Sequence, residues 1–191
     1  MRLVAKVVMV LCLLTMSSHA LGQTTSAAAD TVAIVMRGQL SVAEKSVMEA
    51  AEAMPEETYG FAPSAGEFSG VRTFAQQVKH IAVVNYNFGS TILQGKPPVL
   101  LGGSNGPDSV KTKAEILQFA RESFTYLHKA FDSITAQNML EPIKFGPTNT
   151  TRLRLAAYGV AHPFDHYGQM VEYLRMNGIV PPASRPPAAQ R

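Results

Sequence analysis

The sequence of 191 residues has no tryptophan, few charged residues and a single cysteine. That cysteine, Cys12, lies in an apolar N-terminal run that we expect to be removed, so the mature chain has no thiol. This excludes a disulfide, a thiolate metal ligand and a cysteine nucleophile. Any metal site must therefore be built from nitrogen and oxygen ligands.

An excess of charge of one sign is also missing. The formal net charge is +3, but without Arg2 and Lys6 of the N-terminal segment 15 basic residues stand against 14 acidic ones. No basic cluster with interleaved aromatic residues remains, which argues against a nucleic-acid partner. The apolar content of 46% is enough for a sizeable core, and the length indicates one domain.

Residues 1–22 have the pattern of a secretory signal peptide. A basic start precedes an apolar run from Val7 to Met16, and Ala20 and Gly22 fit a cleavage site before Gln23. The alternative is a transmembrane anchor, but crossing the hydrocarbon core takes about 20 apolar residues and this run has about ten. We expect an exported protein, periplasmic or fully secreted, with no stable membrane insertion after cleavage.

After a polar linker at 23–30, apolar residues recur at helical spacing through most of the chain. Pro and Gly interrupt this pattern and mark its loops. The loop at 94–108 is longer than most connections, and such loops are often functional. The prediction is an all-α four-helix bundle over residues 31–182, followed by a disordered tail at 183–191. Its helices are expected at about 31–53, 69–93, 112–137 and 149–177.

Local signals place the helix ends and faces. Thr112 and Glu115 match a capping box at the start of the third helix. Ser69 is the expected cap of the second helix, and Thr148 or Asn149 that of the fourth. No period-two strand pattern of useful length is present. The buried side of the fourth helix is predicted to consist of Leu153, Ala156, Val160, Phe164, Tyr167, Val171 and Leu174.

Two histidines, His162 and His166, lie four residues apart in the fourth predicted helix. Residues at this spacing share one helix face with Cβ atoms about 5–6 Å apart, so two imidazoles there can converge on one ion. Pro163 predicts a kink near 159–163, because it lacks an amide hydrogen and crowds the carbonyl of Gly159. If the helix instead restarts at Pro163, His162 becomes a cap. By itself the spacing also fits partly exposed or capping histidines.

A third histidine, His80, lies on the second predicted helix and would join the pair if the two helices are neighbours. Three imidazoles with an open position are typical of catalytic rather than structural zinc sites. Nickel, iron(II) and manganese also fit this set, so the ligand chemistry does not select the ion. His128 flanks the apolar stripe of the third helix, and we expect it to be partly exposed rather than a ligand.

Three groups of residues form a pattern over about residues 31–182. They are Pro55 with Tyr59, Phe61 and Pro63; Ser69 with His80 and Ile81; and His162-x-x-x-His166-x-Gly168-Gln169, continuing through Tyr173-Leu174-Arg175 and Gly178 to Pro181-Pro182. This pattern resembles the DinB family of metal-binding helical bundles. The resemblance implies a four-helix bundle, frequent dimers, and a zinc or nickel site on His80, His162 and His166. Related proteins include metal-dependent thiol S-transferases and a maleylpyruvate isomerase, and many members have no known activity.

The resemblance and the expected export lead to two classes of function. The first is an exported metal-dependent enzyme acting on a small molecule, either a transferase or a hydrolase. Export disfavours a transferase that uses an abundant intracellular thiol, and no obvious general base for a hydrolase lies beside the ligands. The second is a non-catalytic metal- or ligand-binding bundle of the cell envelope. A bundle without metal is a third alternative.

Several polar residues are candidates for orienting a ligating imidazole, which usually donates its outer N–H to a carboxylate, carbonyl or water. For each of them a structural role is the stronger expectation, as an interface, surface or core residue. These residues are Asn85, Tyr86, Asp165, Tyr167, Gln169, Glu172 and Arg175.

Overall fold

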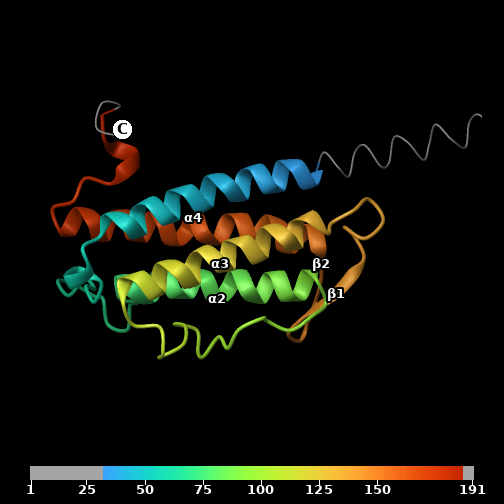
Figure 1. Cartoon of the computed structure of the whole chain (residues 1–191), viewed down its shortest axis with the longest axis horizontal. Helices are drawn as coiled ribbons and strands as arrows, with labels where there is room; N and C mark the ends of the chain where they lie inside the picture. Colours follow the sequence, from blue (N-terminus) through green and yellow to red (C-terminus); the bar gives the residue numbers. More distant parts are fainter. Residues whose placement is uncertain (1–31, 187–191) are drawn as a thin grey trace, which may run out of the picture.

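The computed structural model describes residues 32–186 and shows four long helices with a small β-hairpin at one end (Figure 1). This confirms the predicted all-α bundle. The predicted signal peptide at 1–22 and linker at 23–30 lie outside the described residues. The helices cover residues 32–53, α2 (Phe74–Ile92), α3 (Lys113–Asp132) and α4 (Arg152–Met176).

The capping box predicted for the third helix is present at the start of α3. The Thr112 hydroxyl accepts from the Glu115 amide at 3.2 Å, and the Glu115 carboxylate accepts from the Thr112 amide at 2.9 Å. The two bonds satisfy amide groups that would otherwise lack a partner at the helix end.

The predicted cap of the second helix, Ser69, is wrong. Helix α2 begins at Phe74, four residues after Gly70. Its N-cap is Thr73, which forms a capping box with Gln76. Gly70 has φ +79°, a conformation that does not continue into a right-handed helix. The preceding short 3-10 helix, η1 (Glu56–Thr58), and the loop after it connect the 32–53 helix to α2.

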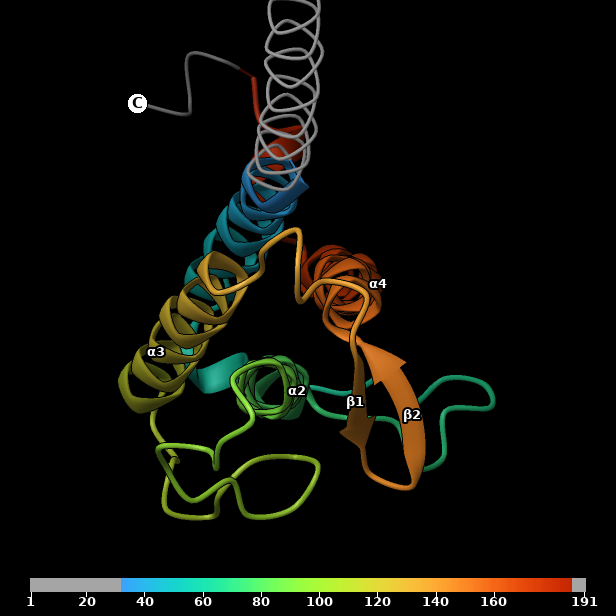
Figure 2. The same cartoon turned by 90° about the vertical axis from the view of Figure 1, so that its right-hand side faces the viewer.

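A β-hairpin that the sequence analysis did not predict joins α3 to α4. Strand β1 (Pro142–Phe145) pairs antiparallel with β2 (Thr148–Thr151), and Gly146 at φ +56° forms part of the turn. Because β2 is wholly polar, it shows no apolar alternation in the sequence. Figure 2 shows the hairpin beside α2 and α4.

The hairpin also moves the start of the fourth helix. The predicted caps Thr148 and Asn149 are strand residues. The hydroxyl of Thr151, at the end of β2, caps α4 instead by accepting from the Arg154 amide at 3.2 Å. Arg152 then lies buried at the base of the hairpin, where its guanidinium contacts the carbonyl of Ile92 and the carboxylate of Glu141.

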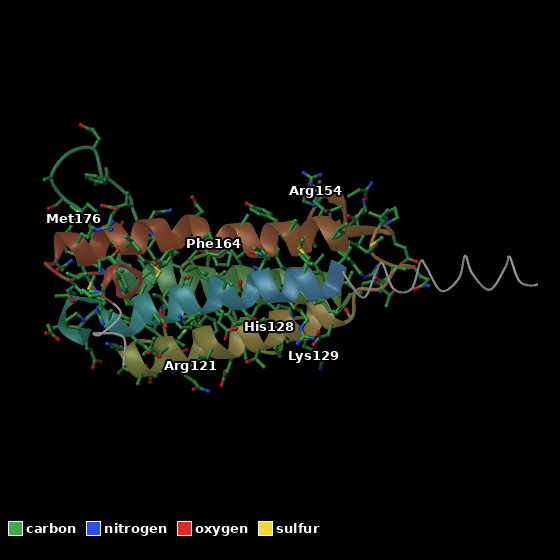
Figure 3. All side chains as sticks on the ribbon, turned by 90° about the horizontal axis from the view of Figure 1, so that it is seen from above. Arg121, His128, Lys129, Arg154, Phe164 and Met176 are labelled. Atoms are coloured by element: carbon green, nitrogen blue, oxygen red, sulfur yellow. The ribbon has the colours of Figure 1, made fainter. Side chains whose placement is uncertain are left out.

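Helix α4 is continuous through Pro163, so the alternative in which the helix restarts there is wrong. Figure 3 shows it passing from Arg154 past Phe164 to Met176 as one helix. The missing side chain of Gly159, one turn before Pro163, leaves room for the Phe131 ring, whose Cζ would lie 3.2 Å from an added Cβ. The kink near 159–163 stays a prediction.

The core fills the space between the helices with aromatic and aliphatic side chains. The apolar residues of α2 and α3 face the core, whereas the buried face of α4 differs from the prediction. Leu153, Val160 and Phe164 are only half-buried, and the inward face carries both histidines of α4. The largest buried side chains include Phe74, Tyr86, Phe88, Phe124, Phe131, Leu127 and Met170.

The C-terminal residues after α4 fold back over the bundle end. The tail was predicted as disordered at 183–191, but Pro182–Ser184 form a 3-10 helix, η2, because two prolines restrict the backbone and Ser184 donates to the Pro181 carbonyl at 2.9 Å. Residues 187–191 lie outside the described part. Among residues 32–186, no helix combines the length and apolarity needed to span a bilayer.

Candidate metal centre

His80, His162 and His166 meet where α2 and α4 pack together. The Nε2 atom of His162 lies 3.3 Å from Nε2 of His80 and 3.2 Å from Nε2 of His166. One ligand atom from each of the three residues lies within 4.8 Å of the others. The structure thus brings together the three residues that the sequence analysis selected.

The helices determine this meeting point. His162 and His166 are one turn apart on the inward face of α4, and both are buried, with 9% and 6% of their surface exposed. His80 lies in α2 and is half-buried, so the cluster reaches the surface on its side. A site that is buried on one side and accessible on the other suits ligand binding.

The outer nitrogen of His166 is bonded to Gln77, which also lies on α2. The Gln77 side-chain oxygen is 2.7 Å from Nδ1 of His166, and its amide nitrogen donates to the side-chain oxygen of Gln169 at 2.8 Å. Because the oxygen of Gln77 only accepts, His166 carries its proton on Nδ1. Its Nε2 lone pair therefore faces the other two histidines.

The outer nitrogen of His80 is bonded to the main chain of the long loop between α2 and α3. The carbonyl oxygen of Ser104 lies 2.6 Å from Nδ1 of His80. A carbonyl only accepts, so His80 also carries its proton on Nδ1 and directs a bare Nε2 into the cluster. Orientation by outer acceptors is typical of metal-binding histidines.

The loop that supplies this carbonyl is itself held against α2. The ammonium group of Lys79 donates to the carbonyls of Pro107 and Val110 at 2.8 and 3.1 Å. Gly106, at φ +81°, passes so close to Lys79 that an added Cβ would lie 2.9 Å from the Lys79 Cβ. Figures 1 and 2 show the loop along the outer side of α2, away from the 32–53 helix.

His162 is positioned by packing rather than by a bond to its outer nitrogen. Its ring lies edge-on to the rings of Tyr158 and Phe88, with centroids 6.1 and 6.4 Å away. Its Nδ1 is buried and has no hydrogen-bond partner among the described residues. Tyr158 is half exposed and lies at the rim of the cluster.

The three residues fit a divalent metal ion. A tetrahedral ion with metal–nitrogen bonds of about 2.0–2.1 Å separates its ligand atoms by about 3.3 Å, and the closest nitrogen pairs here are 3.2 and 3.3 Å apart. The Nε2 atoms of His80 and His166 both direct lone pairs into the cluster, and the single proton of His162 can form a hydrogen bond to only one of them. The remaining lone pair is repelled by its neighbours, and a bound cation removes this repulsion. Among the described residues, no further histidine, cysteine or carboxylate joins the group.

Burial keeps the three imidazoles in the neutral form that binds metal. Burial, followed by the proximity of His166 and His80, lowers the pKa of His162 to about 3. Burial and then His80 lower the pKa of His166 to about 4. Burial also lowers the pKa of His80, although its bond to the Ser104 carbonyl acts in the opposite direction. All three are therefore ready to ligate at neutral pH.

His128 does not belong to this cluster. It lies on α3 beside the 32–53 helix, where its Nε2 is 2.8 Å from the carboxylate of Glu44 (Figure 3). Its side chain is partly exposed, as expected. It therefore offers a matched control for substitutions of the three clustered histidines.

The other polar candidates have structural contacts, as expected. Asn85 and Tyr86 are buried against α3, where Asn85 donates to Ser123. Asp165 accepts from Gln169, and Glu172 pairs with Arg175. Gln169 alone is connected to the site, because it accepts from Gln77.

Sequence reasoning missed Gln77 and Ser104. Gln77 precedes His80 by three residues, and this spacing places both on one side of α2. That signal was available in the sequence. The role of Ser104 had no side-chain signal, since its main-chain carbonyl makes the contact.

A separate groove lies away from the histidines. It has a volume of about 970 Å³ between the outer face of the 32–53 helix and the C-terminal turn, and its lining includes Ser41, Lys45, Glu49 and Pro182. It shares no residue with the cluster. Because the groove lacks a converging set of metal ligands, we place the functional site at the three histidines.

Comparisons with known proteins agree with the fold. A family model described as the DinB superfamily matches residues 39–170, a stretch that contains all three histidines. The chain is similar to the crystal structure of a DinB-like protein from Bacillus cereus ATCC 10987, with 16% identity and a TM-score of 0.57 over 73% of this chain and 89% of that chain. At this identity the likeness shows the fold alone. No curated protein matches the sequence.

Proposed function

Because the chain belongs to the DinB superfamily, we propose that it is an exported protein that binds a divalent metal ion through His80, His162 and His166. One observation carries the proposal. Three imidazole Nε2 atoms converge, and the outer nitrogens of His80 and His166 are each bonded to an oxygen that only accepts. The Nε2 lone pairs of His80 and His166 are therefore directed toward Nε2 of His162. Zinc and nickel are the proposed occupants, because the family resemblance implies them and both accept imidazole ligands.

The proposed activity is that of a metal-dependent hydrolase or transferase acting on a small molecule. Three protein ligands leave a position for a substrate, which is the pattern of catalytic sites. His80, His162 and His166 would hold a divalent ion, which would supply Lewis-acid chemistry toward an oxygen or sulfur atom of the substrate. Gln77 and the Ser104 carbonyl orient His166 and His80, and packing against Phe88 and Tyr158 positions His162. Burial keeps all three imidazoles neutral. Export favours hydrolysis over transfer to an intracellular thiol.

A non-catalytic metal- or ligand-binding bundle is the alternative. No carboxylate joins the three histidines among the described residues, so a general base for hydrolysis is not part of the convergent group. The nearest acidic neighbour of His166 along α4, Asp165, is exposed and accepts from Gln169. A site with an open position but no base binds ligands without turning them over.

Homodimer formation is a further part of the proposal. Ile34, Val35 and Val42 are exposed on the 32–53 helix, at 66%, 50% and 54% of their surface. Burial of such side chains against a second copy would remove apolar surface from water. Sedimentation of the wild type and of a Val42→Glu variant tests this, with a dimer expected only for the wild type.

The test of metal binding is the number of ions per chain in protein purified from its native compartment. We expect close to one ion in the wild type and in His128→Ala, and loss of the ion in His80→Ala, His162→Ala and His166→Ala. Wild-type protein without a metal, or metal that survives all three substitutions, overturns the proposal. Substitution with cobalt(II) then tests for an open position, because added imidazole should change the visible spectrum.

Two further measurements test export and catalysis. N-terminal sequencing of the exported protein should begin at Gln23 if the signal peptide is cleaved as expected. A screen of ester, amide and thiol-transfer substrates with metal-loaded protein should show turnover that His162→Ala abolishes. Binding without turnover would favour the non-catalytic alternative.

A further inference from the structure

A positively charged side chain, Arg72, is bonded to the loop residue that follows Ser104, whose carbonyl orients His80, and it takes no part in the metal site described above. It directly precedes Thr73, the N-cap of α2. Its Nε donates to the side-chain oxygen of Asn105 at 2.8 Å, and its main-chain carbonyl accepts from the Tyr173 hydroxyl at 3.0 Å. Contacts from two different elements therefore fix both its backbone and its guanidinium group.

One dipeptide of the long loop holds both Arg72 and His80. The Ser104 carbonyl is bonded to Nδ1 of His80, and the side chain of the next residue, Asn105, is bonded to Arg72. Adjacent residues of the same loop thus position the guanidinium of Arg72 and the imidazole of His80. On the other helix, Tyr173 lies two turns beyond His166, so α4 contributes both to the histidine cluster and to the placement of Arg72.

Arg72 places a positive charge next to the loop segment that orients His80, because Asn105 holds its guanidinium and Ser104 holds the imidazole. Arginine does not lose its proton in proteins. With three neutral imidazoles and a divalent ion, the site would carry an excess of positive charge, which an anionic ligand neutralises.

The terminal nitrogens of Arg72 remain available. Among residues 32–186, no carboxylate forms an ion pair with Arg72, and its only side-chain hydrogen bond uses Nε. The neighbouring cation, Lys79, is instead occupied by the carbonyls of Pro107 and Val110. A planar guanidinium with two free terminal nitrogens matches the oxygens of a carboxylate or phosphate group.

We propose that Arg72 is the anion-recognition residue of this site and that the small molecule bound there carries a carboxylate or phosphate group. Asn105 is a positioning residue, because it holds the guanidinium through Nε and leaves the terminal nitrogens for the ligand. The inference rests on the proposed metal site, since the ligand would occupy the space beside the three histidines. It narrows the substrate or ligand to small oxyanions.

Calorimetric titration of cobalt-loaded protein with acetate and with inorganic phosphate tests the proposal. We expect at least one of the two to bind, and Arg72→Ala to bind it about ten- to a hundredfold more weakly. Arg72→Lys should recover part of the affinity, because it restores the charge but not the fork. Asn105→Ala should show a smaller loss. Lys96→Ala, which removes an exposed cation of the same loop, should bind as the wild type does.

Binding of imidazole, a neutral ligand, separates anion recognition from damage to the metal site. Arg72→Ala should bind cobalt(II) and imidazole with wild-type affinity. Equal anion affinity in the wild type and Arg72→Ala, or no anion binding by a wild type that binds imidazole, overturns the role of Arg72 while the metal site stands. A wild type that takes up no metal overturns the proposed function itself. If Arg72→Ala does not fold, Arg72→Gln takes its place in the same comparison.

Discussion

The side-chain oxygen of Gln77 lies 2.7 Å from Nδ1 of His166, and both residues are buried between α2 and α4. This single contact determines which nitrogen of His166 faces the cluster. It also connects the histidines to Gln169 through the other end of the Gln77 amide. A residue that is not itself a ligand therefore fixes the orientation of one.

Replacing Gln77 should weaken metal binding without removing a ligand. Loss of an outer partner costs about ten- to a hundredfold in metal affinity, and we expect a loss of that size for Gln77→Leu. Gln77→Glu keeps an acceptor and should bind more tightly than Gln77→Leu. Competition with a chelator measures the affinities, and Gln118→Leu, exposed on α3, is the control. Wild-type affinity in Gln77→Leu would contradict the role assigned to the contact.

The loop that orients His80 should be sensitive to Gly106 and insensitive to Gly103. Gly106→Ala forces a side chain into a left-handed conformation at a cost of about 1–2 kcal/mol, and its Cβ would meet Lys79 at 2.9 Å. The Ser104 carbonyl should shift and metal affinity should fall. At Gly103 an added Cβ meets nothing within 4 Å, so Gly103→Ala should retain its metal. Chelator competition measures the metal affinity of both variants. Equal losses of affinity would refute a specific role for Gly106.

The stability of the metal-free protein should fall as the pH drops below 6.5. In the folded state the pKa values of His162 and His166 are about 3 and about 4, below the ordinary value of 6.5. Between these values the unfolded chain binds protons that the folded chain excludes, so acid favours unfolding. Each histidine contributes at most about 1.4 kcal/mol per pH unit.

Urea unfolding at about pH 7 and about pH 5.5 measures this dependence, in a range where most carboxylates stay ionised. The double variant His162→Ala/His166→Ala should lose less stability over the same interval. A metal-free wild type whose stability is constant between the two pH values would show that its histidines titrate normally.

Two helical glycines should respond to alanine in opposite directions. At Gly89 in α2, an added Cβ would lie 2.7 Å from the Tyr126 ring, so Gly89→Ala should destabilise the fold by about 1–3 kcal/mol. At Gly168 in α4, nothing lies within 4 Å. Gly168→Ala should stabilise by about 0.5–1 kcal/mol through reduced backbone freedom in the unfolded chain. Thermal unfolding measures the change in stability of each variant relative to the wild type. Destabilisation by Gly168→Ala would show that α4 has close neighbours there.

Periodicity predicted the helices well where packing and capping agree. The apolar stripe of the third helix, from Ile116 to Phe131, is buried, and the predicted Thr112 capping box begins α3. The predicted start of α2 is too early because the choice of Ser69 as a cap rests on residue type alone. Thr73 and Gln76 have the spacing of a capping box, as Thr112 and Glu115 do, so the correct cap could have been found in the sequence.

The hairpin and the face of α4 could not be read from the pattern. β2 is polar on both sides and is formed through pairing with β1, a contact that depends on the tertiary structure. In α4 the expected face ran through Val160 and Phe164, because apolar residues were given priority. The structure turns His162, Pro163 and His166 inward instead, since the neutral imidazoles lie against one another and against α2. A prediction based on the spacing of apolar residues does not detect polar residues that are buried at a site.

The oxygen that orients His80 belongs to the main chain of residue 104, whose own side chain is exposed. Every amino acid offers the same carbonyl at that position. The exposed side chain of residue 104 can therefore be varied in size and polarity while His80 keeps its tautomer. Within this one residue, the side chain can change specificity while the main-chain carbonyl keeps the metal ligand in place.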